Sequence, residues 1–347
     1  MMDRYDSAHE LPAEWDQVGR ANYALQRDFL RVMETANPCA QRYYGFRDAH
    51  GSLDSIVMTL VQERLNLLMF TPFAFSVPAT LIYVPISAST AGMACGTATR
   101  AQVAVFLSGL RGLTLVLNLP DSFELPSFAR VATCPRIRLA LRWSSFEAYL
   151  NDLRSGYRRR AILACRKAAP LTFRTLADTN EFTIEHFSLY EQVYNKSSIR
   201  VEKLSLAYFQ TCPATIIVAE FAGKPVGFVQ LLAYRTELIF GFIGLDYTVN
   251  REFDLYQNLM LKIVDYGITH HYTSIDLGQT ADETKLKLGG DYELLYAHLR
   301  HHNPLLDTLL RMLLPLIAYR PLTQQFHVFK SSTVSETATW RVQGSKG

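Results

Sequence analysis

The chain has 347 residues, of which 49% are hydrophobic and 19% are charged, and its formal net charge at pH 7 is +3. This length exceeds one ordinary core and predicts about two domains, and the composition excludes an intrinsically disordered protein. So small a net charge excludes a protein that binds nucleic acid through bulk charge alone, so any anionic partner must be met locally.

Two features of the chain favour a cytoplasmic protein. Residues 1–16 contain acids and no apolar core segment, which disfavours a signal peptide. The cysteines are far apart and form no CxxC pair, a pattern typical of free thiols in a reducing compartment rather than of disulfides or a zinc site. They are Cys39, Cys95, Cys134, Cys165 and Cys212.

The first part of the chain predicts an α+β domain. Apolar residues at helical spacing from Leu25 to Met33 predict a helix, and residues 41–48 and 55–62 alternate like two strands around a turn. Residues 101–112 are expected to form a helix that ends at Gly112, and residues 114–120 the strand after it.

No charged residue occurs from Leu65 to Thr99. A membrane-spanning helix needs roughly 20 continuous apolar residues, whereas Pro72, Pro78 and Pro85 interrupt this run. Because proline breaks helices, we expect buried strands joined by proline turns. A membrane-facing surface, or a surface that lines an acyl-chain site, is the alternative.

Residues 144–170 predict a basic helix that stops before Pro170 and connects the two domains. One side is apolar, and the other carries Arg158, Arg159 and Arg166. Such a face is either simply solvated or binds the phosphates of a nucleotide-linked substrate or of RNA, because arginine binds phosphate in a fork geometry.

The second half has the clearest order of elements. Residues 214–247 predict a three-stranded antiparallel meander with a tight turn at Gly223. A long helix is expected to start near Asn250 or Asp254, because either side chain suits a helix start. A strand at 274–278, a short helix at 282–287 and a strand at 292–302 are expected to follow.

Three antiparallel strands, a helix, a strand, a helix and a last strand is the order of the GNAT acyltransferase core. Four segments of the chain, 189–198, 223–232, 244–268 and 275–290, resemble the BioF2-like and Fem-type branch of that superfamily, in which two GNAT-like domains lie in one chain. Residues 155–168 are similar to the arginine-containing helix of Fem-type aminoacyl ligases.

The resemblance implies an α+β fold of two GNAT-like domains in tandem, each a mixed, mostly antiparallel sheet flanked by helices. We expect the first domain at residues 1–143, the basic interdomain helix at 144–170, the acyltransferase domain at 171–330, and a flexible tail at 331–347. The activity implied is the transfer of an acyl or aminoacyl group to a small-molecule amine acceptor.

Aminolysis of a thioester or ester requires a positioned carbonyl, a hydrogen-bond donor for the oxyanion and a base for the surplus proton. In GNAT folds the fourth and fifth strands part and hold the pantetheine arm, so the cleft is expected between residues 236–247 and 274–278. The glycine-rich coenzyme A loop of the family is missing from residues 248–260, where Phe253, Leu255 and Tyr256 stand. Free coenzyme A is therefore disfavoured, and a tethered donor, an acyl carrier protein thioester or an aminoacyl-tRNA, is favoured; no tightly bound cofactor is expected.

Asp246 and Tyr247 end the central strand beside the expected cleft. Asp246 is a candidate to accept the amine proton or orient the amine, and Tyr247 to donate to the oxyanion or the leaving group, although a strand that simply ends in a turn acid explains them equally well. Asp276 is expected to point into the cleft or to bond a helix start.

Further candidates follow from their position near the same cleft. Gln279, Lys285 and Lys287 come after the strand at 274–278, and at least one lysine is expected to face an anionic substrate. Tyr256 and Asn258 are candidates for contact with the acceptor, with core packing as the other role of Tyr256. Arg251 either pairs with one phosphate or is only exposed.

Other chemistries lack their physical anchors. The histidines at 270, 271, 298, 301 and 302 have no carboxylate or cysteine partner at ligand spacing, so no metal is expected. No GxSxG, P-loop or strand-linked GxGxxG is present. The apolar helix expected after Asn303, which Pro315 should break, either packs on the first domain or contacts a membrane surface or a second copy in a homodimer.

Three functions therefore stay open. The first is an N-acyltransferase or aminoacyltransferase with a tethered donor. The second is a long-chain fatty acyl transferase whose acyl channel is lined by the charge-free run from Leu65 to Thr99. The third is a noncatalytic protein that uses its basic helix to hold RNA or an anionic glycan precursor.

Overall fold

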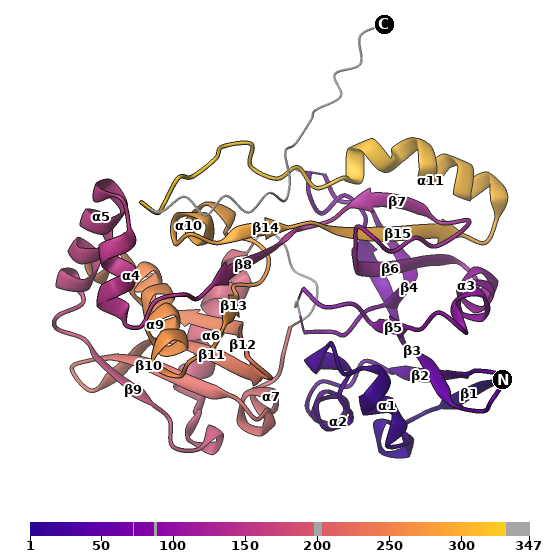
Figure 1. Ribbon diagram of the computed structural model, residues 1–347, viewed down its shortest axis with the longest axis horizontal. Helices are drawn as coiled ribbons and strands as arrows, with labels where there is room; N and C mark the ends of the chain where they lie inside the picture. Colours follow the sequence, from indigo (N-terminus) through magenta and orange to yellow (C-terminus); the bar gives the residue numbers. More distant parts are fainter. Residues whose placement is uncertain (72, 87–88, 198–202, 331–347) are drawn as a thin grey trace, which may run out of the picture.

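The computed structural model describes residues 1–71, 73–86, 89–197 and 203–330. In these residues the chain forms two mixed sheets flanked by helices (Figure 1). Both sheets are antiparallel except for one parallel pair in each, β4 (Ser76–Ile82) with β6 (Leu113–Pro120) and β12 (Glu237–Leu245) with β13 (Ser274–Asp276). The α+β class expected from the alternation of strand and helix patterns is confirmed.

The first sheet has the strand order β1-β2-β3-β4-β6-β15-β7, and β5 pairs with β3 at its side. Its strands are β1 (Met2–Tyr5), β2 (Arg42–Arg47), β3 (Leu53–Asn66), β4 (Ser76–Ile82), β5 (Met93–Cys95), β6 (Leu113–Pro120), β7 (Ala129–Ala132) and β15 (Leu295–His301). The charge-free run thus contributes β4 and β5, as expected, but Pro78 lies inside β4 rather than at a turn, and the first three residues of β4 are not buried.

The second sheet has the order β14-β8-β13-β12-β11-β10-β9. Its strands are β8 (Arg136–Ala140), β9 (Thr172–Thr175), β10 (Thr215–Phe221), β11 (Lys224–Tyr234), β12 (Glu237–Leu245), β13 (Ser274–Asp276) and β14 (Asp291–Glu293). The predicted meander is present as β10, β11 and β12, and Gly223 has a positive φ of 76° at the tight turn between the first two.

Helices cover both sheets (Figure 1). Those of the first part of the chain are α1 (Glu14–Val18), α2 (Arg27–Ala36) and α3 (Arg100–Gly109). The remainder are α4 (Phe146–Asp152), α5 (Ser155–Lys167), α6 (Ile184–Lys196), α7 (Leu206–Thr211), α8 (Asn250–Phe253), α9 (Leu255–Thr269), α10 (Asp282–Lys287) and α11 (Pro304–Ile317). No helix in the described ranges is long and apolar enough to cross a membrane.

The two halves of the chain exchange a strand. β8 follows β7 along the chain but lies in the second sheet, between β13 and β14. β15 follows β14 but lies in the first sheet, between β6 and β7. The sheets therefore do not divide at the expected boundaries of 143 and 171, and the single strand expected at 292–302 is two strands in different sheets.

The basic segment differs from the expected single interdomain helix. It forms two helices, α4 and α5, because the chain turns at Leu153 and Arg154, where the backbone is extended. Ser145 caps α4 by accepting a hydrogen bond from the backbone N–H of Ala148 at 3.1 Å. Buried Ala161 and Ala164 of α5 pack in the core of the second domain, where α5 lies against α8 and α9 rather than bridging the domains.

The last helix also departs from expectation at one point. α11 continues through Pro315 to Ile317 instead of ending before the proline. A proline in the last helical turn removes only one backbone hydrogen bond, and the packing of Leu310 and Ile317 on the first sheet holds the turn in place. The predicted packing of this helix on the first domain is confirmed. Residues 331–347, the expected tail, lie outside the described residues.

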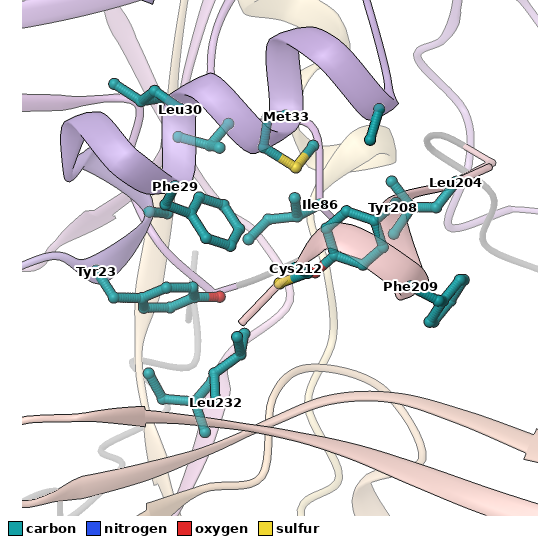
Figure 2. Close-up of a cluster of buried hydrophobic side chains, with 14 of the residues drawn as sticks. Tyr23, Phe29, Leu30, Met33, Ile86, Leu204, Tyr208, Phe209, Cys212 and Leu232 are labelled. Atoms are coloured by element: carbon teal, nitrogen blue, oxygen red, sulfur yellow. The ribbon is translucent and has the colours of Figure 1, made fainter. Parts of the chain in front are cut away.

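One hydrophobic core joins the two domains. Figure 2 shows Tyr23, Phe29, Leu30, Met33 and Ile86 of the first half facing residues of the second half. Those residues are Leu204, Tyr208, Phe209, Cys212 and Leu232. All of these side chains are at most 8% exposed, so the relative position of the domains is fixed by packing.

Candidate functional site

The chain leaves its parallel partner strand β12 at the end of β13. The two strands pair only from Glu237 with Ser274 to Ile239 with Asp276, and β13 ends there. β12 continues to Leu245. On its other side it stays paired with β11 up to this residue, whose partner is Gly227. Residues 240–245 of β12 therefore present a strand edge that β13 does not cover, at the place where the resemblance to GNAT folds implies a cleft.

A cavity of about 570 Å³ opens beside this gap. Its walls come from both halves of the chain, and it has an apolar part and a polar part. The apolar part is lined mainly by the first sheet and the chain that follows β3, including Leu65, Leu67, Met69, Phe70, Tyr83, Leu115, Leu117, Val131, Ala297, Leu299 and Ile317. The polar part lies where β12 and β13 separate.

Asp276 lies in the polar part and is only 2% exposed. Its carboxylate accepts hydrogen bonds from the Ser89 hydroxyl and from the backbone N–H of Gly278, each at 2.7 Å. The guanidinium of Arg136 lies 3.6 Å away and balances the buried charge. Because Ser89 belongs to the first half of the chain, this contact also ties the two domains together at the cavity.

Lys285 is the second buried charge of the site. It lies on α10, is 3% exposed, and its Nζ donates to the backbone carbonyl of Gln279 at 2.7 Å. Burial lowers the pKa of this lysine to about 8, although the charges of Asp276 and Asp282 oppose the shift. A neutral amine is therefore accessible slightly above neutral pH, which suits a proton acceptor.

The loop between β13 and α10 shapes this polar part. Gly278, Thr280 and Ala281 have positive φ values of 72°, 64° and 51°, and the last two are unfavourable for residues with a Cβ. The side-chain amide of Gln279 donates to the Asn118 side chain and to the backbone carbonyl of Cys134 in the first half. These contacts hold the strained loop, and with it the carbonyl that Lys285 contacts.

Two tyrosines line the cavity at the other end of the gap. Tyr247 lies two residues after the end of β12, and Tyr256 lies on α9. Burial raises the pKa of both phenols, so both keep their protons and can donate hydrogen bonds. The ammonium of Lys196 lies 3.8 Å above the centre of the Tyr247 ring.

Asp246 has a different position from the one expected. Its carboxylate accepts hydrogen bonds from the backbone N–H of Thr248 at 2.9 Å and from the Thr248 hydroxyl at 2.6 Å. It is not among the residues that line the cavity. This geometry is that of a turn acid after a strand, so the role of proton acceptor predicted for Asp246 gains no support from its contacts.

The structure places the other predicted residues away from the cavity wall. Asn258 is buried and ties α9 to α5 by donating to the backbone carbonyl of Ala164 at 2.8 Å. Lys287 pairs with Glu283 and lies over the ring of Phe326. Arg251 lies in α8 and is exposed. Arg158, Arg159 and Arg166 are exposed on α5.

Sequence reasoning missed Ser89, Asn118, Arg136 and Lys196. Ser89 and Asp276 are 187 positions apart, and no motif links them. Arg136 enters the site because β8 crosses into the second sheet, an exchange that strand patterns do not reveal. For Ser89 the only signal in the sequence is the charge-free run that contains it, because one interpretation of that run is a surface that lines an acyl-chain site.

At the start of α9, where coenzyme A would bind in a GNAT fold, the chain fills the space itself. Phe253 and Leu255 are buried in the core. The backbone N–H of Tyr256 donates to the side chain of Asn250 at 3.0 Å. Asp254 places a carboxylate beside this helix start and pairs with Lys167 at 3.0 Å. The N–H of Tyr256 is therefore taken by the chain itself, and the Asp254 carboxylate opposes a second negative charge, so this helix start is unfavourable for a pyrophosphate.

Comparisons with known proteins identify the fold. No family model matches the sequence, and no curated protein matches it. Among solved structures, FemX matches with a TM-score of 0.56 and 8% identity, over 89% of this chain and 100% of FemX. A C-terminal domain of an Agrobacterium fabrum protein named after lysylphosphatidylglycerol synthetase matches with a TM-score of 0.55 and 12% identity, over 86% of this chain and 93% of that domain.

A third structure, L-PGS from Bacillus licheniformis, matches with a TM-score of 0.51 and 13% identity, over 89% of this chain and 98% of that one. At such low identity these matches establish the fold alone. In this chain each of the two sheets contains one parallel pair, and in the second sheet the two strands of that pair separate beside the cavity. The chain thus has the tandem GNAT-like fold that the Fem-type resemblance implies.

Proposed function

We propose that this protein is an acyltransferase that moves an acyl or aminoacyl group from a tethered donor to an amine by direct aminolysis. The observation that carries the proposal is the uncovered edge of β12, which opens onto a cavity with buried Lys285 and Asp276 at its polar part. A strand edge can hold the donor arm by backbone hydrogen bonds. The fold shared with FemX and L-PGS supports the same reaction class by analogy.

The reaction needs few groups from the protein. The amine nitrogen forms a bond to the donor carbonyl carbon, and the bond from that carbon to the sulfur or oxygen of the donor breaks. Neutral Lys285 accepts the surplus proton of the attacking amine, and Asp276 attracts the resulting ammonium. The phenol of Tyr247 or Tyr256 donates to the oxyanion or to the departing sulfur or oxygen.

A tethered donor fits the surface better than free coenzyme A. The start of α9 disfavours an anion, because Asn250 accepts from the N–H of Tyr256, Phe253 fills the space beside it and Asp254 carries a carboxylate there. The exposed arginines of α5 supply a basic surface for the phosphates of a tRNA or for an acidic carrier protein. Both kinds of donor bring their acyl group on a long arm, so the body of the donor stays outside the cavity.

The test is to offer the full-length protein aminoacyl-tRNAs and acyl-loaded carrier proteins in parallel, with a mixture of amines, and to identify new amides by mass spectrometry. The proposal predicts an amide from one donor class only. Product formation that ribonuclease abolishes identifies the tRNA, whereas resistance to ribonuclease identifies the carrier protein. Donor hydrolysis without any amide would contradict the proposal.

A second function is favoured by the apolar part of the cavity. Its lining by Leu65, Leu67, Met69 and Phe70 matches the idea of a long-chain fatty acyl transferase, because a channel without charges accepts an alkyl chain at low cost in free energy. Carrier proteins loaded with acyl chains of increasing length distinguish this function. Rates that rise with chain length favour it, and equal rates for acetyl and palmitoyl donors exclude it.

A further inference from the structure

Two tyrosines hold a buried carboxylate beside Lys285. Asp282, the first residue of α10, is 7% exposed. Its Oδ2 accepts a hydrogen bond from the hydroxyl of Tyr292 at 2.6 Å and another from the hydroxyl of Tyr319 at 2.7 Å. Its Oδ1 has no hydrogen-bond partner in the part of the chain that the structure describes. We call Asp282, Tyr292 and Tyr319 the carboxylate clamp.

The carboxylate clamp joins three segments that are far apart in the chain. Asp282 is on α10, Tyr292 is on β14, and Tyr319 follows α11. The backbone N–H of Leu322 donates to the hydroxyl oxygen of Tyr292 at 3.4 Å, and the backbone N–H of Tyr319 donates to the carbonyl of Ala132 at 3.0 Å. Main-chain contacts thus help to fix both tyrosines, and the tyrosines in turn fix the carboxylate.

The phenols of the clamp keep their protons. Burial, and then the charge of Asp282, raises the pKa of both Tyr292 and Tyr319. Each protonated phenol donates to the carboxylate, so two hydrogen bonds compensate the buried charge. The ion pair on α10 joins Lys287 to Glu283 instead, and among the described residues no cation is in contact with Asp282.

Lys285 lies one helical turn after Asp282, and side chains three residues apart share a face of a helix. Because Lys285 is only 3% exposed, a direct ion pair between these two residues would be favourable. In the described structure the ammonium instead donates to the backbone carbonyl of Gln279 at 2.7 Å. Since the two phenols occupy Oδ2, the carboxylate stays out of contact with the ammonium.

The other titratable groups that face Lys285 are held in a comparable way. Asp276 of β13 lies 3.6 Å from the guanidinium of Arg136, which balances its charge. Burial raises the pKa of the Cys134 thiol, in the chain after β7, to about 12, so this thiol is uncharged. Burial of Lys285 therefore outweighs the attraction of Asp276 and Asp282, in agreement with its lowered pKa.

We propose that Tyr292 and Tyr319 are positioning residues that hold the Asp282 carboxylate out of contact with Lys285, and so keep this lysine free to accept a proton at the cavity. The two tyrosines touch no substrate and act only through Asp282. This role rests on the proposed function, because a free lysine base matters only if aminolysis takes place in the cavity. The effect of the clamp on Lys285 can nevertheless be measured without turnover.

The test is an NMR titration of the Lys285 side chain in the full-length protein with isotope-labelled lysine, in which Lys285→Met assigns the signal. Tyr292→Phe with Tyr319→Phe frees the carboxylate to pair with the ammonium, so the pKa of Lys285 should rise by about one unit. Asp282→Asn keeps an acceptor for both phenols but removes the charge, so the pKa of Lys285 should fall by about one unit. Loosening of α10 alone would not shift the pKa in opposite directions.

The matched control is Tyr149→Phe. The hydroxyl of buried Tyr149 donates to the backbone carbonyl of Leu288, at the end of α10, at 3.0 Å. This change removes a phenol contact to the same helix without touching Asp282, so the pKa of Lys285 should stay as in the wild type. Melting temperatures check that all variants fold, and Tyr319→Phe alone, with a smaller rise expected, replaces the double variant if that protein does not fold.

An unchanged or lowered pKa of Lys285 in the tyrosine variant would overturn the proposal, as would an unchanged pKa in Asp282→Asn. The pH profile of kcat separates this result from the proposed function. If Lys285 is the base, the midpoint of the profile should move with the NMR titration, to higher pH in the tyrosine variant and to lower pH in Asp282→Asn. A midpoint that stays in place while the NMR titration moves supports the clamp and contradicts the role of Lys285 as the base.

Discussion

Burial lowers the pKa of two bases, Lys285 and His298, with different consequences for the protein. Burial lowers the pKa of Lys285 to about 8 beside the parted strands, and it lowers the pKa of His298 to about 4 inside the first sheet. Lys285 faces the cavity, whereas His298 has a ring nitrogen without a hydrogen-bond partner in the described structure. Lys285 is therefore interpreted as functional, and His298 as a cost to stability at acid pH.

If Lys285 accepts the amine proton, turnover should rise with pH and level off above about pH 8, where the amine is neutral. Lys285→Met should lower kcat by roughly 100-fold or more and remove this rise. The matched control is Lys224→Met, at the exposed first residue of β11 outside the cavity. Measured pH profiles of kcat that coincide for the wild type and Lys285→Met would assign the proton transfer to another group.

Acid should destabilise the fold through His298. Between pH 6.5 and about 4 the unfolded chain holds a proton on this histidine and the folded chain does not, so the free energy of unfolding falls as the pH falls through this window. The loss amounts to roughly 3 kcal/mol. His298→Leu should reduce that loss, as measured by urea denaturation at pH 7.5 and pH 4.5. Equal acid sensitivity of the two proteins would mean that the folded histidine titrates normally.

Among the elements, α5 leads to a prediction that does not depend on the residues of the cavity. Its arginines are exposed, and the helix is held to α9 by its alanine side and by Asn258. Replacement of Arg158, Arg159 and Arg166 by Ala should therefore leave folding intact. If the donor is a tRNA, the change should weaken RNA binding and lower the steepness of its salt dependence by about three, one for each lost phosphate contact. The measurement is RNA binding at several salt concentrations. If the salt dependence of the variant has the same slope as that of the wild type, tRNA does not bind this face of α5.

The sequence predicts those elements whose signals are local. The turn at Gly223 and the alternation around it specify β10, β11 and β12, and the parting of β12 from β13 follows from the resemblance. The exchange of β8 and β15 escapes such reasoning, because strand patterns do not name their partners. Lys285, Asp276 and Tyr247 could be predicted as candidate site residues, because they end or follow the strands that the resemblance places at the cleft. Ser89 and Arg136 could not, because they reach the site from the first half of the chain.

At the scale of the whole molecule, the shared core and the exchanged strands predict that the two halves unfold together. Leu232 of β11 is 5% exposed and packs in the core that both halves contribute to. Leu232→Ala should cost about 2 to 5 kcal/mol of unfolding free energy and shift one cooperative transition. Calorimetry that resolves two transitions, of which only one moves, would show that the halves are independent.

The central claim is that the uncovered edge of β12 holds the donor carbonyl. It can be measured directly by hydrogen exchange with a non-reactive amide analogue of the donor, in which the scissile sulfur or oxygen is replaced by N–H. The account predicts slower exchange in residues 240–247 and 277–281 on binding, with no change in β10, at the far side of the sheet. Bound analogue that leaves the exchange of residues 240–247 unaltered would contradict it.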